Sequence, residues 1–209
     1  MPKQKGNKVV TLNNQGFMRV ELDKFSRKCG ATIISNDIEM KHLSIIKDRI
    51  APNLQKKLYL NCNSFPDEID IPDNSLGGVL FSRVVHFFTE DKMIDSLKKI
   101  HKILIPGGSL FFVSVSPYHY TLAKEFLPIF LERKKNGDKN PGYIHNMKKY
   151  MLSPKSSDFV PDFLNAWDVS TISKLLKINN FEIITGEYFD YSQNNSQSMG
   201  FTGVEACKI

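Results

Sequence analysis

Short apolar runs alternate with predicted helices over the first 115 residues, and this alternation restricts the fold more than any other feature of the chain. Five runs have the length and the residue types of buried strands. They cover residues 8–13, 31–35, 57–62, 78–82 and 109–115. Three stretches between them have helical spacing of apolar residues or helix-ending residues, and they cover residues 17–28, 38–50 and 90–104. Thr89 is the predicted N-cap of the third helix. Strands that alternate with helices predict a doubly wound, mostly parallel α/β sheet.

The second half of the chain departs from this rhythm. Residues 116–167 contain five prolines and many aromatic residues, with one clear helical stretch at 122–135. The elements predicted beyond them are a helix capped by Asp168 and two strands at 181–189 and 200–209. At 209 residues the chain is most simply one domain, 1–209, with residues 116–167 as an insertion.

The composition is that of a folded globular protein, with 41% hydrophobic and 24% charged residues. The net charge of +6 comes mainly from scattered lysines and not from a basic stripe, which disfavours nucleic acid as a partner. The cysteines, Cys29, Cys62 and Cys207, have neither metal-ligand spacing nor the pattern of a disulfide framework. No apolar run reaches membrane-spanning length. The sequence therefore predicts a cytoplasmic protein with no membrane span and no metal site.

Polar residues follow four of the predicted strands. They are Asn13 to Gly16, Asn36 and Asp37, Asn63 and Ser64, and Ser82 and Arg83. The carboxyl ends of parallel strands meet at one edge of a sheet, and open α/β sheets bind their ligands there. Asp37 is the strongest single candidate, because a carboxylate at the end of the second strand accepts hydrogen bonds from both hydroxyls of a ribose. The alternative for Asp37 is an N-cap of the following helix.

Three further stretches carry the motifs of one enzyme family. Residues 99–110, KIHKILIPGGSL, are similar to a helix, an L-x-P-G-G turn and a fifth strand. Residues 71–80, IPDNSLGGVL, resemble a P-x-x-S-F-D-x-V entry to a fourth strand, and residues 168–209 resemble a final helix and strand pair. Together these stretches resemble the class I S-adenosylmethionine-dependent methyltransferases, especially the bacterial enzymes that act on small molecules. The resemblance implies a Rossmann-like sheet of seven strands with an antiparallel last strand, and it makes residues 116–167 a candidate substrate cover.

The resemblance also implies S-adenosylmethionine as the cofactor and methyl transfer to a small-molecule acceptor as the activity. The residues that it places around the cofactor are Asn13, Gly16, Asp37, Ile38, Asn63, Ser64, Phe65, Ser82 and Arg83. Ile38 and Phe65 are candidates to pack on the adenine ring, with a plain core position as the alternative for each. Asn63 stands where family members place an acid near the adenine amino group.

The cofactor loop departs from the family pattern. VVTLNNQG at residues 9–16 falls where the family has V-L-D-x-G-x-G-x-G. Thr11 replaces the acid, Asn13 and Gln15 replace the first two glycines, and only Gly16 survives. Side chains there obstruct close approach of the backbone to a ligand, although Asn adopts left-handed conformations more readily than most residues. A second interpretation therefore stays open, a catalytically inactive methyltransferase-like protein that acts as a binding or interaction module with a protein partner.

His86, Tyr118 and His119 are the candidate catalytic residues. A neutral imidazole suits proton removal from an oxygen or nitrogen acceptor near neutral pH, so each histidine is a candidate general base. The alternative for both is a histidine with a purely structural role. Tyr118 follows the fifth strand and either faces the acceptor pocket or packs under the insertion. A nicotinamide-dependent oxidoreductase is a third interpretation of the chain, which the inserted final strand disfavours.

Overall fold

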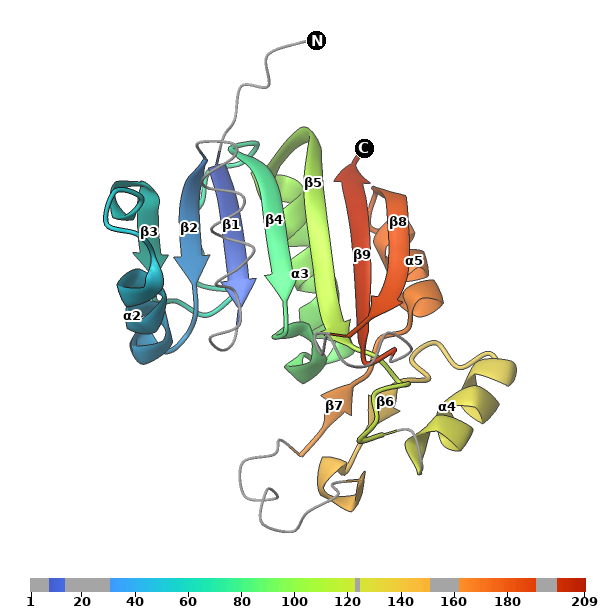
Figure 1. Ribbon diagram of the computed structural model, residues 1–209. Helices are drawn as coiled ribbons and strands as arrows, with labels where there is room; N and C mark the ends of the chain where they lie inside the picture. The colour runs from blue at the N-terminus through green and yellow to red at the C-terminus, as the bar shows by residue number, and fades with distance from the viewer. Residues whose placement is uncertain (1–7, 14–30, 123–124, 151–161, 191–198) are drawn as a thin grey trace.

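The structure, a computed structural model, describes residues 8–13, 31–122, 125–150, 162–190 and 199–209 (Figure 1). A sheet of seven strands has the order β3-β2-β1-β4-β5-β9-β8. Five strands are parallel, namely β1 (Lys8–Asn13), β2 (Thr32–Asn36), β3 (Leu58–Asn61), β4 (Leu76–Ser82) and β5 (Leu104–Val115). The last strand, β9 (Phe201–Lys208), lies antiparallel between β5 and β8 (Phe181–Phe189). The predicted Rossmann-like α/β fold is confirmed.

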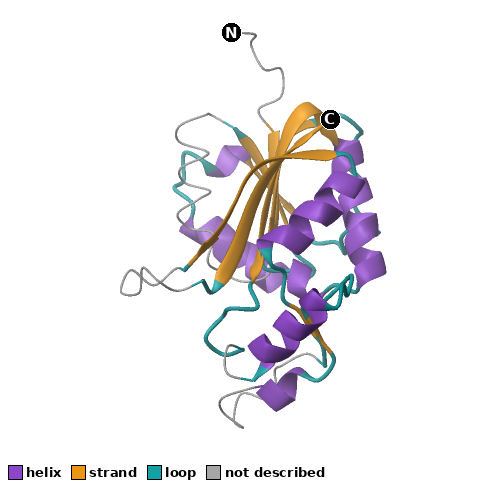
Figure 2. Cartoon of the chain, turned by 90° about the vertical axis from the view of Figure 1, so that its right-hand side faces the viewer, coloured by secondary structure: helices purple, strands orange, loops and turns teal. Residues whose placement is uncertain are grey.

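Helices cover both faces of this sheet, as Figure 2 shows. The helices are α2 (Met40–Arg49), α3 (Glu90–Ile103) and α5 (Val169–Ile178). Neighbouring residues of a strand point to opposite faces. Accordingly, Ile33 packs with Ile46 of α2, whereas Ile34 packs against the main core, to which α3 and α5 contribute.

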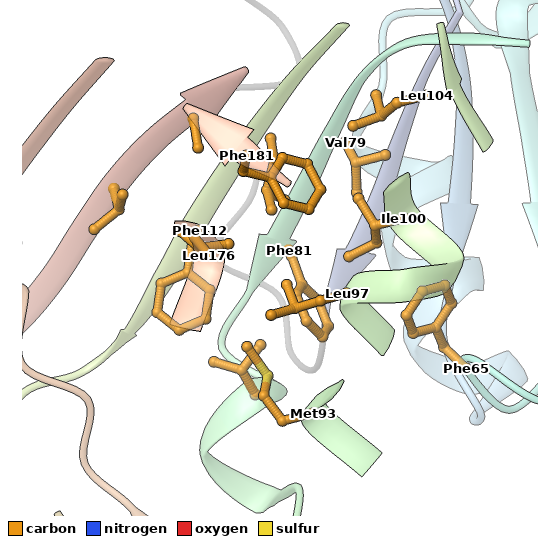
Figure 3. Packing of buried hydrophobic residues seen from close by; sticks show 14 of the residues in the cluster. Phe65, Val79, Phe81, Met93, Leu97, Ile100, Leu104, Phe112, Leu176 and Phe181 are labelled. Atoms are coloured by element: carbon orange, nitrogen blue, oxygen red, sulfur yellow. The ribbon is translucent and has the colours of Figure 1, made fainter. Parts of the chain in front are cut away.

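The main core lies between α3, α5 and the middle of the sheet (Figure 3). Each element contributes a fully buried stripe, because the apolar residues of the helices recur at i, i+3, i+4 and i+7 and those of the strands alternate. The labelled side chains show this interlock: Val79 and Phe81 from β4, Phe112 from β5, Met93, Leu97 and Ile100 from α3, and Leu176 from α5. Burial of this apolar surface is the main stabilising contribution that holds the sheet and helices together.

Two predicted helix caps are confirmed. The side chain of Thr89 accepts a hydrogen bond from the Lys92 N–H, and that of Asp168 accepts one from the Thr171 N–H. The predicted boundary between α3 and β5 is wrong, because the helix ends at Ile103 and the strand already begins at Leu104. The predicted helix at 17–28 lies outside the described residues.

The register of β5 explains this error. Leu104 pairs with Leu76 of β4, and pairing resumes between Ser109 and Gly78, so that residues 105–108 bulge out of the ladder. Gly107 takes a φ of +74° in this bulge. The Pro-Gly-Gly sequence therefore forms a bulge inside the strand, and it is not the point where the helix ends.

The insertion has a small core and a sheet of its own. It contains α4 (Phe126–Lys135) and two short antiparallel strands, β6 (Tyr143–Ile144) and β7 (Leu164–Asn165). The predicted start of its helix at residue 122 was four residues too early, and the strand pair was not predicted. Its core side chains are Leu122, Phe126, Phe130, Ile144, Met147, Leu164 and Ala166. In Figure 1 the insertion lies at the carboxyl end of β5.

The buried carboxylate of Asp168 connects the insertion to the sheet domain. Lys134 Nζ of α4 donates to Asp168 Oδ2 at 2.5 Å, and the Asp168 side chain is completely buried. The hydroxyl of Ser170 donates to the same oxygen. Burial alone would raise the pKa of Asp168, but the hydrogen bonds from Lys134, Thr171 and Ser170 hold this pKa below its ordinary value. The carboxylate is therefore charged at neutral pH and serves as both a helix cap and a tether.

Candidate functional site

The strand register brings the predicted polar residues to one edge of the sheet. Asn13 at the end of β1 lies opposite Ser82 at the end of β4, and Asn36 of β2 lies opposite Asn61 of β3. The carboxyl ends of four adjacent strands therefore form a continuous rim, as predicted. Of the loop after β1, Gly16 lies outside the described residues, as does the side chain of Asn13.

Asp37 follows β2 directly and is anchored through one of its two oxygens. Asp37 Oδ1 accepts a hydrogen bond from the Glu39 N–H at 2.9 Å and lies 3.2 Å from His42 Nδ1. The first of these bonds is an Asx turn at the start of α2, so the predicted capping role is present, two residues before the helix. No hydrogen bond to Oδ2 is found among the described residues. The Asp37 side chain is nearly buried, and Oδ2 is its oxygen without a hydrogen bond within the described ranges.

Three asparagine amides connect the ends of β2 and β3. Asn36 Nδ2 donates to the main-chain oxygen of Asn63 at 3.1 Å, Asn61 Nδ2 to Asn36 Oδ1 at 2.9 Å, and Asn63 Nδ2 to Asn61 Oδ1 at 2.9 Å. The main-chain N–H of Asp37 also donates to the Asn61 carbonyl at 3.2 Å. The predicted residues Asp37 and Asn63 are therefore held in a fixed relation to each other.

The two residues predicted to pack on adenine differ in solvent exposure. Ile38 is 73% exposed beside Asp37, so its side chain is accessible to a ligand. Phe65 is only 5% exposed, and its ring packs edge-on against Phe81 in the main core at 5.7 Å (Figure 3). This burial favours the core alternative for Phe65, and its contact with adenine stays a prediction.

The structure limits which groups of Ser64 and Ser82 are available to a cofactor. The Ser64 N–H donates to Glu68 Oε2 at 2.8 Å, and the Glu68 N–H donates back to the Ser64 carbonyl at 2.9 Å. The main chain of Ser64 is therefore already engaged in its own turn. Ser82 is 5% exposed at the end of β4. Its predicted contact with the cofactor stays a prediction.

Arg83 has an unusual backbone conformation at the end of β4. Its φ is +59°, in the left-handed region that residues other than glycine rarely adopt. The main-chain N–H donates to the Val113 carbonyl at 2.9 Å, and the guanidinium carbon lies 5.4 Å from the centre of the Phe201 ring. Strained residues of this kind concentrate at functional sites. Arg83 thus brings a positive charge to the end of the sheet where β5 and β9 meet.

The structure disfavours the predicted role of His86 as a general base. Burial, then the positive charge of Arg83 and then His119 lower the pKa of His86 to about 3. The ring is therefore neutral at physiological pH, but a base whose conjugate acid has so low a pKa removes protons poorly. Its Nδ1 is buried and has no hydrogen-bond partner in the described part of the chain.

Acid is expected to destabilise the protein through His86. The pKa of His86 is lower in the folded state than its ordinary value of 6.5, so from pH 6.5 down to about 3 only the unfolded state gains the proton. Stability from His86 is therefore present above pH 6.5 and falls by roughly 1–2 kcal/mol between pH 7 and pH 5. Urea unfolding at the two pH values measures the loss. His86→Gln is expected to lose less unfolding free energy between the two pH values than the wild type does. His145→Gln, an exposed control, is expected to lose the same amount as the wild type. Equal losses in all three proteins would contradict the assignment to His86.

The hydrogen bonds of the His119 ring bear on its predicted role as a general base. His119 Nδ1 lies 2.7 Å from the Thr121 hydroxyl oxygen and accepts a hydrogen bond from the Thr121 N–H at 3.3 Å, which favours the tautomer with the proton on Nε2. Burial lowers the pKa of His119, Asp190 opposes this effect, and Arg83 adds to it. In this tautomer Nε2–H is suited to donate a hydrogen bond to an acceptor molecule and not to accept a proton.

Tyr118 packs between the insertion and β8. Its ring meets Phe130 edge-on at 6.1 Å and Tyr188 at 5.2 Å. Burial raises the pKa of Tyr188 to about 12, with smaller contributions that include a hydrogen bond to Tyr118. The structure thus favours the packing alternative for Tyr118 over a catalytic role.

The sequence did not predict that His42, Asn36 and Asn61 contact the predicted residues Asp37 and Asn63. Only the proximity of Asn36 to the strand end was visible in the sequence. Within the described ranges, no group of three or more His, Cys, Asp and Glu residues is arranged to hold a metal ion. The described helices include none with the length and apolarity that crossing a membrane requires.

Comparison with known proteins gives one family match. Residues 15–112 match a family described as a methyltransferase domain. None of the curated proteins matches the sequence.

Solved structures share the fold at low sequence identity. An S-adenosylmethionine-dependent methyltransferase from Methanosarcina mazei is 14% identical with a TM-score of 0.71, over 99% of this chain and 94% of that chain. A putative methyltransferase from Haloferax volcanii, in complex with the Trm112 methyltransferase activator, is 13% identical with a TM-score of 0.62, over 99% and 84%.

A third similar structure contains bound ligands. It is the 1,6-didemethyltoxoflavin-N1-methyltransferase from Burkholderia thailandensis with 1,6-didemethyltoxoflavin and S-adenosylhomocysteine. It is 12% identical with a TM-score of 0.59, over 96% of this chain and 70% of that chain. Residues 15–112 are therefore similar to the methyltransferase domain family, and the chain as a whole shares the fold of S-adenosylmethionine-dependent methyltransferases.

Proposed function

We propose that this protein binds S-adenosylmethionine along the rim formed by β1, β2, β3 and β4 and transfers its methyl group to a small-molecule acceptor. The observation that carries the proposal is Asp37, an acid at the end of β2 that is fixed through Oδ1, and we assign its Oδ2 to a ribose hydroxyl. S-adenosylmethionine is the cofactor of the family.

The described residues fit the nucleoside half of this cofactor. Asp37 offers a charged acceptor to the ribose, Ile38 offers an exposed apolar side chain to one face of the base, and Asn63 lies beside both on the next strand end. When bound, the cofactor supplies an electrophilic methyl group on a sulfonium. The protein's task is then to hold the acceptor in line and to exclude water, which needs few ionisable side chains.

The groups after β4 and β5 support an acceptor site with hydrogen-bond donors and one positive charge. Arg83 supplies the charge, and His119 supplies the Nε2–H in its neutral form. His86 remains neutral beside them. We propose that residues 116–167 cover this site, because the insertion lies at the same end of the sheet (Figure 1). The free thiols of Cys62 and Cys207 agree with a reducing cytoplasmic location, which we include in the proposal.

Calorimetric titration with S-adenosylhomocysteine tests the cofactor site without the unknown acceptor. We expect a micromolar dissociation constant, which corresponds to about 8 kcal/mol of binding free energy. No heat at high protein concentration, together with an unchanged melting temperature, would contradict the proposal and support the inactive interaction module. The substitutions of the glycine loop at Asn13 and Gln15 favour that alternative. If the loop is the obstacle, changing both residues to Gly restores binding.

Asp37→Asn is expected to weaken binding of S-adenosylhomocysteine by about 10- to 100-fold, because a charge-assisted hydrogen bond to a ribose hydroxyl is lost. The same titration measures the change. Asp48→Asn is the matched control, since Asp48 is exposed on α2, the helix that follows Asp37. Equal affinities of the two variants would show that Asp37 does not contact the ligand.

A further inference from the structure

We infer that Asn165 positions the loop that follows β4 and thereby couples the insertion to the proposed cofactor site. This loop, residues 83–88, begins next to Ser82 at the rim and includes the short helix η2 (Val85–Phe87). The observation behind the inference is a side chain of the insertion that is bonded to the main chain of this loop, because Asn165 Nδ2 donates to the Phe88 carbonyl at 2.6 Å. The inference rests on the proposed function, since it needs a cofactor bound at the rim.

The side chain of Asn165 is a buried amide with both of its ends engaged. Asn165 is 0% exposed, and amides are buried where hydrogen bonds satisfy their polar atoms. The Phe88 carbonyl only accepts, so Asn165 Nδ2 faces it, and Asn165 Oδ1 accepts from Asn140 Nδ2 at 3.0 Å. Asn140 is held in turn by its own N–H, which donates to Asp138 Oδ1 at 2.9 Å. The amide therefore fixes one carbonyl of the loop against the insertion.

The loop contains a strained residue, Arg83. Its φ is +59°, and a residue other than glycine keeps this conformation only where its surroundings fix it. The Arg83 N–H donates to the Val113 carbonyl of β5 at 2.9 Å, which fixes the start of the loop, and the bond from Asn165 fixes its end. Because η2 lies between these two bonds, loss of the second lets the loop shift and Arg83 relax. The rim at the end of β4 would then change shape.

Asn165 also belongs to the segment through which the insertion rejoins the sheet domain. Two residues later the Trp167 N–H donates to the Val115 carbonyl at 3.1 Å, and the Thr202 hydroxyl donates to the Trp167 carbonyl at 2.6 Å. β7 lies beside η2 at the same end of the sheet (Figure 1). A displacement of this segment therefore acts on the loop directly. The tether at Asp168 differs, since it joins α4 to the start of α5 without involving the loop.

The bond from Asn165 links the insertion and the cofactor rim in both directions, because coupling between two sites is reciprocal. A cofactor that binds the rim with the loop in this position holds the loop, and the loop holds the insertion through Asn165. An insertion that is docked on the loop in turn raises the affinity of the rim for the cofactor. One factor describes both effects, so each measurement checks the other.

Asn165→Leu removes the bond with little change in side-chain volume. We expect it to weaken binding of S-adenosylhomocysteine by about 5- to 10-fold in a calorimetric titration, because the loop is no longer held. Asp168→Ala is the control, since it loosens the insertion by the route that avoids the loop, and its dissociation constant is expected to match that of the wild type. An unchanged dissociation constant in Asn165→Leu, or equal losses of affinity in both variants, would overturn the inference.

Amide hydrogen exchange measures the reverse direction. The Ala166 N–H, which donates to the Gly142 carbonyl at 3.0 Å, reports on the strand pair of the insertion. In the wild type, saturating S-adenosylhomocysteine is expected to slow its exchange by about 5- to 10-fold, the same factor as the loss of affinity. This slowing is expected to disappear in Asn165→Leu and to persist in Asp168→Ala. A purely structural Asn165 would lower protection with and without the ligand and leave the ratio unchanged, which would also overturn the inference.

Asn140→Ala gives a second route if Asn165→Leu does not fold, as thermal unfolding shows. It removes the donor that holds the other end of the amide at a half-buried position, so we expect smaller losses of affinity and of ligand-dependent protection. An unchanged affinity together with unchanged protection in Asn140→Ala would contradict the coupling. Failure of the wild type to bind S-adenosylhomocysteine would overturn the proposed function and this inference together, whereas normal binding without these effects would overturn the inference alone.

Discussion

Replacing Asp168 with Ala is expected to lower the free energy of unfolding by about 3 kcal/mol. The change removes the N-cap of α5 and the buried partner of Lys134 at the same time. Urea unfolding followed by circular dichroism measures the effect, and fluorescence of the only tryptophan, Trp167, reports the junction itself.

Asp95→Ala is the matched control. Its carboxylate lies 3.4 Å from Lys98 on the surface of α3, with both side chains largely exposed, so its loss is expected to change stability by less than about 0.5 kcal/mol. If Asp168→Ala is no more destabilising than Asp95→Ala, the contact between Asp168 and Lys134 does not stabilise the protein as expected. The lowered pKa of Asp168 also predicts how stability depends on pH. The stability that Asp168 contributes is present above its ordinary pKa of 3.8 and is lost as the pH falls through the lower folded-state value.

Gly142→Ala is expected to disrupt the strand pair of the insertion. A Cβ at residue 142 would lie 1.7 Å from the carbonyl oxygen of Ala166, where the partner is rigid backbone. The same approach provides the hydrogen bond from the Ala166 N–H to the Gly142 carbonyl at 3.0 Å. Relief of the clash requires β6 and β7 to separate, so we expect a loss of at least about 3 kcal/mol.

Amide hydrogen exchange shows which elements Gly142→Ala disrupts. We expect loss of protection in β6, β7 and α4, with the amides of β4 and β5 less affected. Gly137→Ala is the control, because its Cβ meets no atom within 4 Å and its φ of +78° is expected to add only about 1 kcal/mol of strain. Unchanged protection around residue 142 would contradict the close packing of the two strands.

Local sequence signals predicted those elements whose causes are local. The strands β1 and β8 have the predicted bounds, because their apolar residues stand between clear polar or turn residues. The caps Thr89 and Asp168 were readable because a capping side chain lies next to the helix that it caps. The start of β5 was missed, since the bulge at residues 105–108 depends on pairing with β4.

The site was predictable in position but less so in chemistry. The rim followed from the strand ends, whereas the two bonds from Asn36 to Asn61 and Asn63 join residues 25 and 27 positions apart and leave no local trace in the sequence. The role expected of His86 assumed an ordinary pKa, but burial and Arg83 are tertiary effects. For Phe65 the sequence left adenine packing and a core position open, because its packing on Phe81 is a tertiary contact.

The insertion leaves and re-enters the sheet domain at neighbouring points, since the N–H of Trp167 donates to the carbonyl of Val115 at 3.1 Å. A segment whose two ends already touch places no constraint on the distance between the strands that it connects. Its length and sequence can therefore diverge while the sheet and the rim stay in register. Grafting the corresponding segment of a methyltransferase of similar fold between these two residues therefore tests the proposal that the insertion covers the acceptor.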